Sequence, residues 1–463
     1  MRKKKIFGAL VFFAGFFAFG EFNRFGIPDS TEIRRARTEA WFYAGLDALR
    51  EKKAEVAKNL LGQEFQIRME ESGSVFAVIV APKVPLETEI YTENGVETTV
   101  IDTFPADACG SWVFIKNSSD GKPLKLRIYF SMDSEEYVQF TPSGTKTLAD
   151  FVISGLYAVR SVPVGIPFER LYRSSFEQIF TITENLLPWA YTDRQQGQFD
   201  SKLRMISAIR KNLERVVYSP DSCYDEDGKP VFISTGESRT VDFDEIEKTR
   251  GKIEKPVTVD EAGFLKWIVD GLVEPVTGSL LYRKPLLVPT VEVNELGSKG
   301  VLAQNYDVMF CLDWCRNLAA ATLSVKSKRN YLWKDSGVDV QIEPFASEVT
   351  ESGFTQTAGY LKNSGYQIEK LKPVLYVLAS TEPAYCYLAA IKRPVKETGL
   401  SASEVFVFDR CAVLFPLYDD EGRFNCVVFE NGQELKFDQF LEKYRGCFVH
   451  LSRLLTENDF YLQ

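Results

Sequence analysis

The residues of this chain best suited to nucleophilic chemistry are its cysteines and its histidine. His450 is the only histidine, whereas cysteine occurs eight times, at positions 109, 223, 311, 315, 386, 411, 426 and 447. A cysteine attacks as the thiolate and needs a neighbouring base. Cys311 belongs to a helical pattern, "NYDVMFCLDWCRNLAAATLSV", and is the candidate partner of His450. One hypothesis is therefore an active thiol hydrolase that uses Cys311 and His450 as its catalytic residues.

The chain lacks the residues of several other common catalytic and binding sites. A single histidine cannot supply the two or three His ligands of most His-ligated zinc sites, and we expect no metal site. The chain has no Gly-x-Ser-x-Gly elbow for a serine nucleophile. It also has no Gly-x-Gly-x-x-Gly or Walker loop for a nucleotide, so we expect no cofactor.

A second candidate region is the stretch "TVDEAGFLKWIVDGL", residues 258 to 272. Its apolar residues recur at three- and four-residue spacings, which predicts an amphipathic helix. Thr258 and Glu261 have the spacing of a capping box, in which Glu261 would only stabilise the start of the helix. On the residues alone, this structural interpretation is the simplest one.

The sequence "VDEAGFLKWIVDGL" also resembles the nucleophile helix of the NlpC/P60 family of papain-like cell-wall peptidases, whose motif is Asp-Cys-Ser-Gly-Phe followed by an apolar helix. Asp260, Gly263 and Phe264 match that motif. Glu261 stands at the place of the cysteine, and Ala262 at that of the serine. A thiol gains reactivity in the first turn of a helix because the helix dipole stabilises the thiolate. A carboxylate there is no acyl nucleophile for an amide.

The resemblance places the family's catalytic histidine on a later strand, for which "FDRCAVLFP" is the best match. Asp409, Arg410 and Cys411 stand where the imidazole is expected. Both departures imply that the papain-like fold is retained and that its catalytic residues have been replaced, so we expect no catalytic residues there. We expect Glu261 and Arg410 to form an ion pair that lines the former cleft. The implied role is binding of cell-wall peptide or of an envelope protein partner, without cleavage.

The N-terminus predicts export. Residues 2 to 5 are basic, residues 6 to 20 are apolar, and Ala18 and Gly20 provide small residues for cleavage after position 20. We therefore expect a signal peptide and a periplasmic or extracellular protein. Membrane attachment would come only from an uncleaved signal.

The charge balance disfavours nucleic acid as a partner. Loss of residues 1 to 20 leaves 51 Lys and Arg against 64 Asp and Glu, a net charge of about -13 at neutral pH. Such a surface repels phosphate backbones, and no basic stripe with interleaved aromatic residues offsets it.

The pattern along the chain predicts an α+β multidomain protein, with a β-sandwich near the N-terminus, a helical middle and a papain-like α+β domain at the end. One helix is expected from Ser30 to Leu61. Strands of the last domain include "PVLYVLAS", "YCYLAAIK" and "EVFVFDRCAVLFPLYD", and the turn "DDEG" makes a hairpin. The expected segments are 1–20 signal peptide, 21–62 N-terminal helix, 63–160 β-sandwich, 161–256 helical region with a hairpin, and 257–463 NlpC/P60-like domain.

A third hypothesis assigns binding to the β-sandwich. In that case the protein is a structural envelope component, and its last domain only supports the first. Deletion of the sandwich would then abolish binding, and a change at Glu261 would not.

Overall fold

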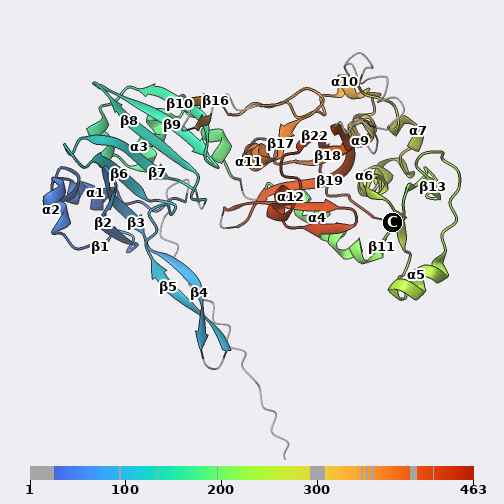
Figure 1. Ribbon diagram of the computed structural model, residues 1–463, viewed down its shortest axis with the longest axis horizontal. Coiled ribbons are helices and arrows are strands. Elements are labelled where there is room, and N and C mark those ends of the chain that lie inside the picture. Colours follow the sequence, from blue (N-terminus) through green and yellow to red (C-terminus); the bar gives the residue numbers. More distant parts are fainter. Residues whose placement is uncertain are drawn as a thin grey trace, which may run out of the picture. The chain divides into compact units, whose positions relative to one another are not determined.

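A computed structural model describes residues 26–92, 95–131, 133–195, 197–291, 308–345, 348–350, 353–355, 359–396, 404–420 and 422–462. The predicted signal peptide lies outside these residues. Contacts divide the chain into two units, Met1–Ala149 with Ser161–Asn185 and Asp150–Arg160 with Leu186–Gln463. The structure confirms an α+β multidomain architecture with large antiparallel sheets (Figure 1).

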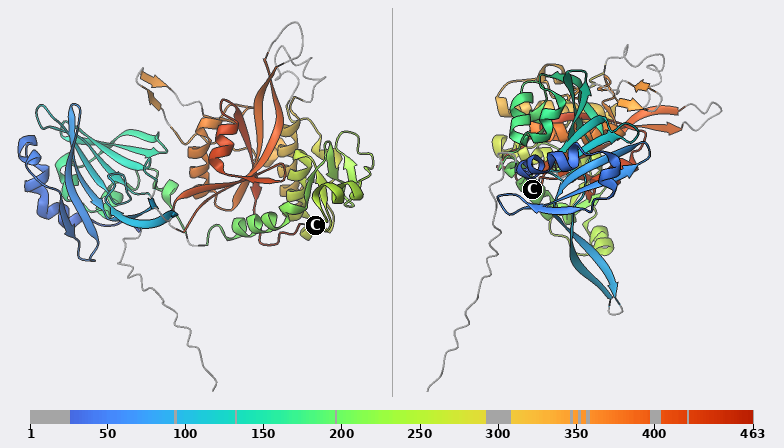
Figure 2. Two further views of the ribbon diagram at one scale, coloured as in Figure 1. Left: turned by 60° about the horizontal axis from the view of Figure 1, so that its bottom comes forward. Right: turned by 90° about the vertical axis from the view of Figure 1, so that its left-hand side faces the viewer.

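The first half of the chain is built on one eight-stranded sheet with the order β1-β2-β3-β6-β7-β8-β9-β10, antiparallel from β1 to β8. Its strands are β1 (Glu55–Lys58), β2 (Glu64–Ser72), β3 (Val75–Pro82), β6 (Trp112–Asn117), β7 (Pro123–Tyr129), β8 (Tyr137–Ser143), β9 (Lys146–Ile153) and β10 (Leu156–Val164). Alternating apolar residues give the first half of β2 one buried face, whereas β3 is buried on both faces from Val78 to Pro82. Strands β4 (Val84–Thr92) and β5 (Gly95–Thr103) form a separate hairpin that projects from the sheet (Figure 2).

Short helices pack on this sheet through aromatic rings. They are α1 (Thr31–Arg37), the π-helical turn η1 (Thr38–Phe42), α2 (Leu46–Arg50), the 3-10 helix η2 (Phe168–Arg173) and α3 (Phe176–Thr183). The ring of Phe114 lies 5.7 Å from that of Phe42 and 4.5 Å from that of Tyr172. Such tilted pairs bury large apolar areas and fix the helices to the sheet.

The prediction of one helix from Ser30 to Leu61 is wrong in its second half. Helix α2 ends at Arg50, and Glu55–Lys58 form the edge strand β1. Val56 pairs with Gln66, and Ala57 pairs with Phe65. Pairing with β2 overrides a weak local preference for helix, because the sheet supplies a backbone partner along its whole edge.

The second unit contains a six-stranded antiparallel sheet with the order β17-β22-β18-β19-β20-β21. Its strands are β17 (Tyr366–Gln367), β18 (Tyr385–Lys396), β19 (Glu404–Tyr418), β20 (Phe424–Glu430), β21 (Gln433–Leu435) and β22 (Phe448–Leu455). The predicted hairpin at "DDEG" joins β19 to β20 and is confirmed. Smaller pairs are β11 (Val216–Tyr218) with β14 (Val257–Val259), β12 (Ser222–Tyr224) with β13 (Pro230–Phe232), and β15 (Glu348–Thr350) with β16 (Gly353–Thr355).

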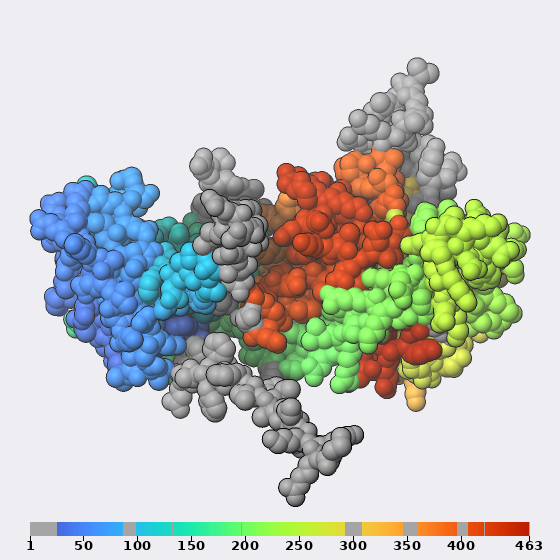
Figure 3. All heavy atoms as spheres, turned by 90° about the horizontal axis from the view of Figure 1, so that it is seen from below, coloured from blue at the N-terminus to red at the C-terminus, as the bar shows by residue number. Residues whose placement is uncertain are grey.

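Helices of the second unit cover both faces of the sheet. They are η3 (Trp189–Thr192), α4 (Asp200–Asn212), η4 (Leu213–Arg215), α5 (Phe243–Arg250), α6 (Glu261–Thr277), α7 (Arg283–Leu286), α9 (Phe310–Ser327), α10 (Trp333–Ser336), η6 (Ile368–Lys370), α11 (Leu371–Thr381) and α12 (Phe437–Lys443). Helices α11 and α12 bury one face, with Tyr387 and Ile391 of β18 in their core cluster. Helices α6 and α9 contact the sheet through β19, and α9 also reaches β18 and β22. Helix α4 also contacts the sheet, since Lys202 Nζ donates 2.7 Å to Pro416 O of β19, and Figure 3 shows green residues of this region beside red residues from later in the chain.

The expectation of a strand at "PVLYVLAS" is wrong, because these residues lie in α11. Leu375 and Leu378 are fully buried, as are most residues of this helix. A run that is apolar on all sides fits a buried strand and a buried helix equally well, so periodicity cannot separate them. Among the described residues, we find no helix with the length and apolarity needed to cross a membrane.

Candidate functional site

The start of α6 is shaped by Asp260 and Gly263. Asp260 is the N-cap, and its Oδ1 accepts a hydrogen bond of 2.7 Å from Gly263 N. Thr258 lies in β14, so the predicted Thr258–Glu261 capping box is wrong. A Cβ on Gly263 would lie 2.0 Å from Ser222 O of β12, so only glycine lets the helix approach that strand. The glycine of the motif therefore has a packing role.

Glu261 and Arg410 form an ion pair between the first residue of α6 and the middle of β19, through Glu261 Oε1 and Arg410 Nη1. The side chain of Glu261 is 14% exposed and that of Arg410 is 40% exposed. A β-bulge places Arg410 here: Arg410 pairs with Ile391 and Phe408 with Lys392, which leaves Asp409 as an extra residue. Bulges of this kind redirect side chains. The structure thus brings the two sequence-predicted binding residues together.

Charged residues that sequence reasoning did not identify surround this pair. Lys443 Nζ of α12 lies 2.7 Å from Glu430 Oε2 at the end of β20, and the Tyr444 hydroxyl donates to Glu430 Oε1. Arg393 of β18 pairs with Asp409. These residues are far from Glu261 in sequence. Glu430 is the polar last residue of the apolar strand β20, but Lys443 in α12 and Arg393 inside β18 have no such local signal.

The electrostatics of the pair are set by burial. Burial raises the pKa of Glu261, and the nearby Arg410 guanidinium counteracts this shift only in part. Burial also raises the pKa of the preceding Asp260, to about 6. The carboxylate at the helix start is therefore kept in a setting that does not favour its charge, a pattern that is common at functional sites.

A cavity of about 580 Å³ lies at the start of α6, where the N-cap Asp260 lines it and Glu261 and Arg410 themselves do not. Two of its lining residues, Asp260 and Asp409, directly precede Glu261 and Arg410 in the sequence. Asp221 and Asp313 also line it, together with the apolar Phe310 and Leu286 among others. The size fits a small ligand or a peptide side chain, and the carboxylates favour a cationic group.

Cys311 and His450, the pair of the hydrolase hypothesis, are held by different neighbours. The thiol of Cys311 interacts with that of Cys411, and Cys315 lies close by. Cys411 and His450 pair with Ala390 from opposite sides, so their strands lie about 10 Å apart. Cys311 is 2% exposed, and His450 is fully buried. Neither group is open to a substrate in this structure.

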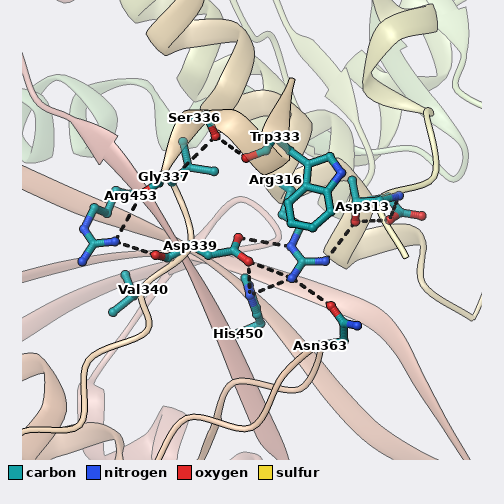
Figure 4. Close-up of polar contacts among 12 residues, drawn as sticks. Asp313, Arg316, Trp333, Ser336, Gly337, Asp339, Val340, Asn363, His450 and Arg453 are labelled. Carbon is teal, nitrogen blue, oxygen red and sulfur yellow. Dashed lines mark hydrogen bonds and ion pairs between the residues drawn. The ribbon is translucent and has the colours of Figure 1, made fainter. Parts of the chain in front are cut away.

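His450 belongs to a buried polar network, drawn in Figure 4. Its Nε2 lies 3.3 Å from Asp339 Oδ2 and 3.4 Å from Arg316 Nη2. Arg316 donates to both oxygens of Asp339, at 3.1 and 2.8 Å, and stacks 4.3 Å above the Trp333 ring. The pKa of Asp339 falls to about 2, although its burial acts in the opposite direction, because His450 and Arg316 stabilise its carboxylate. This network connects α9 to β22 and has the character of a structural core.

The arrangement at the head of α6 can bind charge but offers no nucleophile for amide cleavage. Glu261 is a carboxylate already paired with Arg410, and Cys411 is fully buried, with its pKa raised by its contact with Cys311 and by burial. Within the described part of the chain, no group of three or more His, Cys, Asp or Glu residues is arranged to hold a metal ion.

Comparison with known proteins bears on the first half of the chain. A family model described as a domain of unknown function (DUF8515) matches residues 23–191. No curated protein and no solved structure matches the chain. The matched residues end before α4, so this similarity carries no information about Glu261, Arg410 or the cavity beside them.

Proposed function

We propose that the second unit is a non-catalytic, papain-like binding domain that holds peptide at the head of α6 without cleaving it. The main observation in support of this proposal is the ion pair of Glu261 and Arg410. By the resemblance, Glu261 stands at the place of the catalytic cysteine and Arg410 in the segment where the imidazole is expected, and the two side chains meet at the helix start. An exported protein of this kind would bind cell-wall peptide, the ligand class that the NlpC/P60 resemblance implies, or an envelope protein.

The acidic cavity supports a peptide with a free amino group as the ligand. Asp260 and Asp409 directly precede the two residues of the ion pair in the sequence, and both line the same cavity. Asp409 is also paired with Arg393, and both side chains are 34% exposed, so this pair is accessible to an incoming ligand. An ammonium group entering the cavity would gain carboxylate partners in a partly desolvated setting.

Peptide titration tests this proposal. Purified full-length protein is titrated with cell-wall stem peptide that carries a free side-chain amine, and with the same peptide acetylated at that amine. We expect the Asp409→Asn variant to bind the amine peptide at least fivefold more weakly, since it removes one cavity carboxylate. The matched control is Glu442→Gln, which neutralises a carboxylate of α12 that is 65% exposed.

Equal affinity of wild type and Asp409→Asn for the amine peptide would show that the cavity is not the site. Equal affinity of the wild type for the free and acetylated peptides would exclude amine recognition. Loss of binding on deletion of residues 63–160, with Asp409→Asn unchanged, would favour the β-sandwich hypothesis instead.

A further inference from the structure

Two cysteines lie where helix α9 meets strand β19. Phe408 N of β19 donates a hydrogen bond of 2.7 Å to Val308 O, which lies just before the start of α9. Cys311 and Cys411 each lie three residues further along the chain. This backbone bond therefore holds the start of α9 against β19 directly before both cysteines.

Alternation along β19 directs the Cys411 side chain toward α9. The next residue, Ala412, belongs to the core cluster that also contains Leu375 of α11 and Phe440 of α12. Successive residues of a strand point to opposite faces of a sheet, so Cys411 points to the face that α6 and α9 contact. On that face, the Cys411 thiol interacts with the Cys311 thiol.

The neighbouring strands support this direction. Cys411, Ala390 and His450 lie opposite one another in β19, β18 and β22, so their side chains share one face of the sheet. His450 Nε2 lies 3.4 Å from Arg316 Nη2 of α9. Helix α9 therefore crosses this row of side chains, with Arg316 at β22 and Cys311 at β19.

Both thiols are poor nucleophiles in the folded protein. Cys311 is 2% exposed, and Cys411 is fully buried. The contact with Cys311 and burial together raise the pKa of Cys411 well above its ordinary value. Because the thiolate is the form that attacks a disulfide, a thiol held in its protonated form exchanges slowly. Oxidation of this pair therefore belongs to the folding of the chain, before α9 covers β19.

We propose that Cys311 and Cys411 form a disulfide bond that ties α9 to β19. The oxidant is a small disulfide such as oxidised glutathione. The thiolate of one cysteine attacks a glutathione sulfur and releases one reduced glutathione, and the thiolate of the other cysteine then displaces the second. The two thiol protons pass to the two leaving glutathione molecules. One protein disulfide and two reduced glutathione molecules result.

The bond constrains a long stretch of the unfolded chain. It closes a loop of about 100 residues, which contains α10, α11 and β18. A cross-link of this kind stabilises a protein mainly because it reduces the entropy of the unfolded state. Arg410 directly precedes Cys411, so the bond also anchors the backbone that carries this residue. The bond goes beyond the peptide proposal and does not rest on it, because it requires only the fold and an oxidant.

Peptide mapping of the full-length protein tests the bond. Protein is refolded from urea in oxidised and reduced glutathione until its circular dichroism matches that before unfolding. It is then alkylated under denaturing conditions, digested with trypsin without reduction and analysed by mass spectrometry. We expect peptide 300–316 to be linked to peptide 411–423, and the link to be lost after reduction. Since peptide 300–316 contains both Cys311 and Cys315, fragmentation between them identifies the linked sulfur.

Two variants separate this pair from its neighbour. Cys311→Ala should remove the link, whereas Cys315→Ala is the matched control, because Cys315 lies one turn further along α9 and is fully buried. We expect oxidation to raise the urea midpoint of unfolding by at least about 0.5 M in wild type and in Cys315→Ala, and by less than about 0.1 M in Cys311→Ala. Free thiols at both positions in refolded wild type would overturn the proposal, as would a link through Cys315 or an equal rise of the midpoint in Cys311→Ala.

Discussion

Replacement of Arg410 by methionine removes the guanidinium that faces Glu261 and keeps most of the apolar length of the side chain. Two unit charges about 4 Å apart attract by about 4 kcal/mol at an effective dielectric constant near 20. Arg410 is 40% exposed, so water screens much of this attraction. We therefore expect Arg410→Met to lower the free energy of unfolding by about 1–2 kcal/mol at pH 7.

This loss should depend on pH with a definite sign. Burial already holds the pKa of Glu261 above its ordinary value, and removal of Arg410 raises that pKa further. A carboxyl group with a raised pKa in the folded state costs stability once the unfolded carboxyl ionises, above about pH 4.3. Below that pH both states are protonated, so the difference between wild type and Arg410→Met disappears. The double variant Glu261→Gln with Arg410→Met should lack this pH dependence.

Urea unfolding followed by tryptophan fluorescence measures the effect at pH 7 and pH 4. Trp314 reports on the region, because its indole Nε1 donates 2.9 Å to Ala262 O. Arg445→Met is the matched control: Arg445 is 72% exposed and pairs with Glu442, so we expect a change below about 0.5 kcal/mol. An Arg410→Met variant as stable as wild type at pH 7, or equally destabilised at both pH values, would refute this reasoning.

Three further predictions concern buried residues. Gly263→Ala should lower the free energy of unfolding by about 2–3 kcal/mol, because its Cβ meets Ser222 O at 2.0 Å; an unchanged melting temperature by circular dichroism would contradict this. Asp339→Asn should lower the free energy of unfolding in urea by about 3–5 kcal/mol, because Arg316, which is 1% exposed, loses its counter-charge. A loss below about 1 kcal/mol would show that the network contributes little to stability. Burial lowers the pKa of Lys202 to about 7. Between pH 9 and 7 the unfolded state therefore binds a proton that the folded state does not, so the free energy of unfolding of wild type should fall as the pH falls, while that of Lys202→Met should not change. Parallel plots of unfolding free energy against pH for the two proteins would disprove this.

The helix and the hairpin nearest the candidate site could be predicted from the sequence. Apolar residues at helical spacing located α6, and the turn "DDEG" between apolar runs located the β19–β20 hairpin. Both signals are local, since periodicity and turn chemistry act within a few residues. The pairing of Glu261 with Arg410 was expected from the resemblance to a peptidase motif and not from local physics.

Features that depend on distant contacts could not be predicted in the same way. The N-cap is Asp260 instead of Thr258, because Thr258 is held in β14 by pairing with Val217. Glu430 and Tyr444 join the site only because β20 and α12 fold next to β19, and no spacing in the sequence encodes this proximity. The strand at Glu55–Lys58 likewise depends on an available sheet edge.

We propose that the site at Glu261 and Arg410 holds peptide and does not cut it. Mass spectrometry of cell-wall stem peptide after prolonged incubation with the purified protein, together with equilibrium dialysis of the same samples, measures both properties. We expect saturable binding, with the peptide recovered at its original mass. Cleaved fragments formed faster than with heat-denatured protein, or an absence of binding to the intact peptide, would contradict the claim.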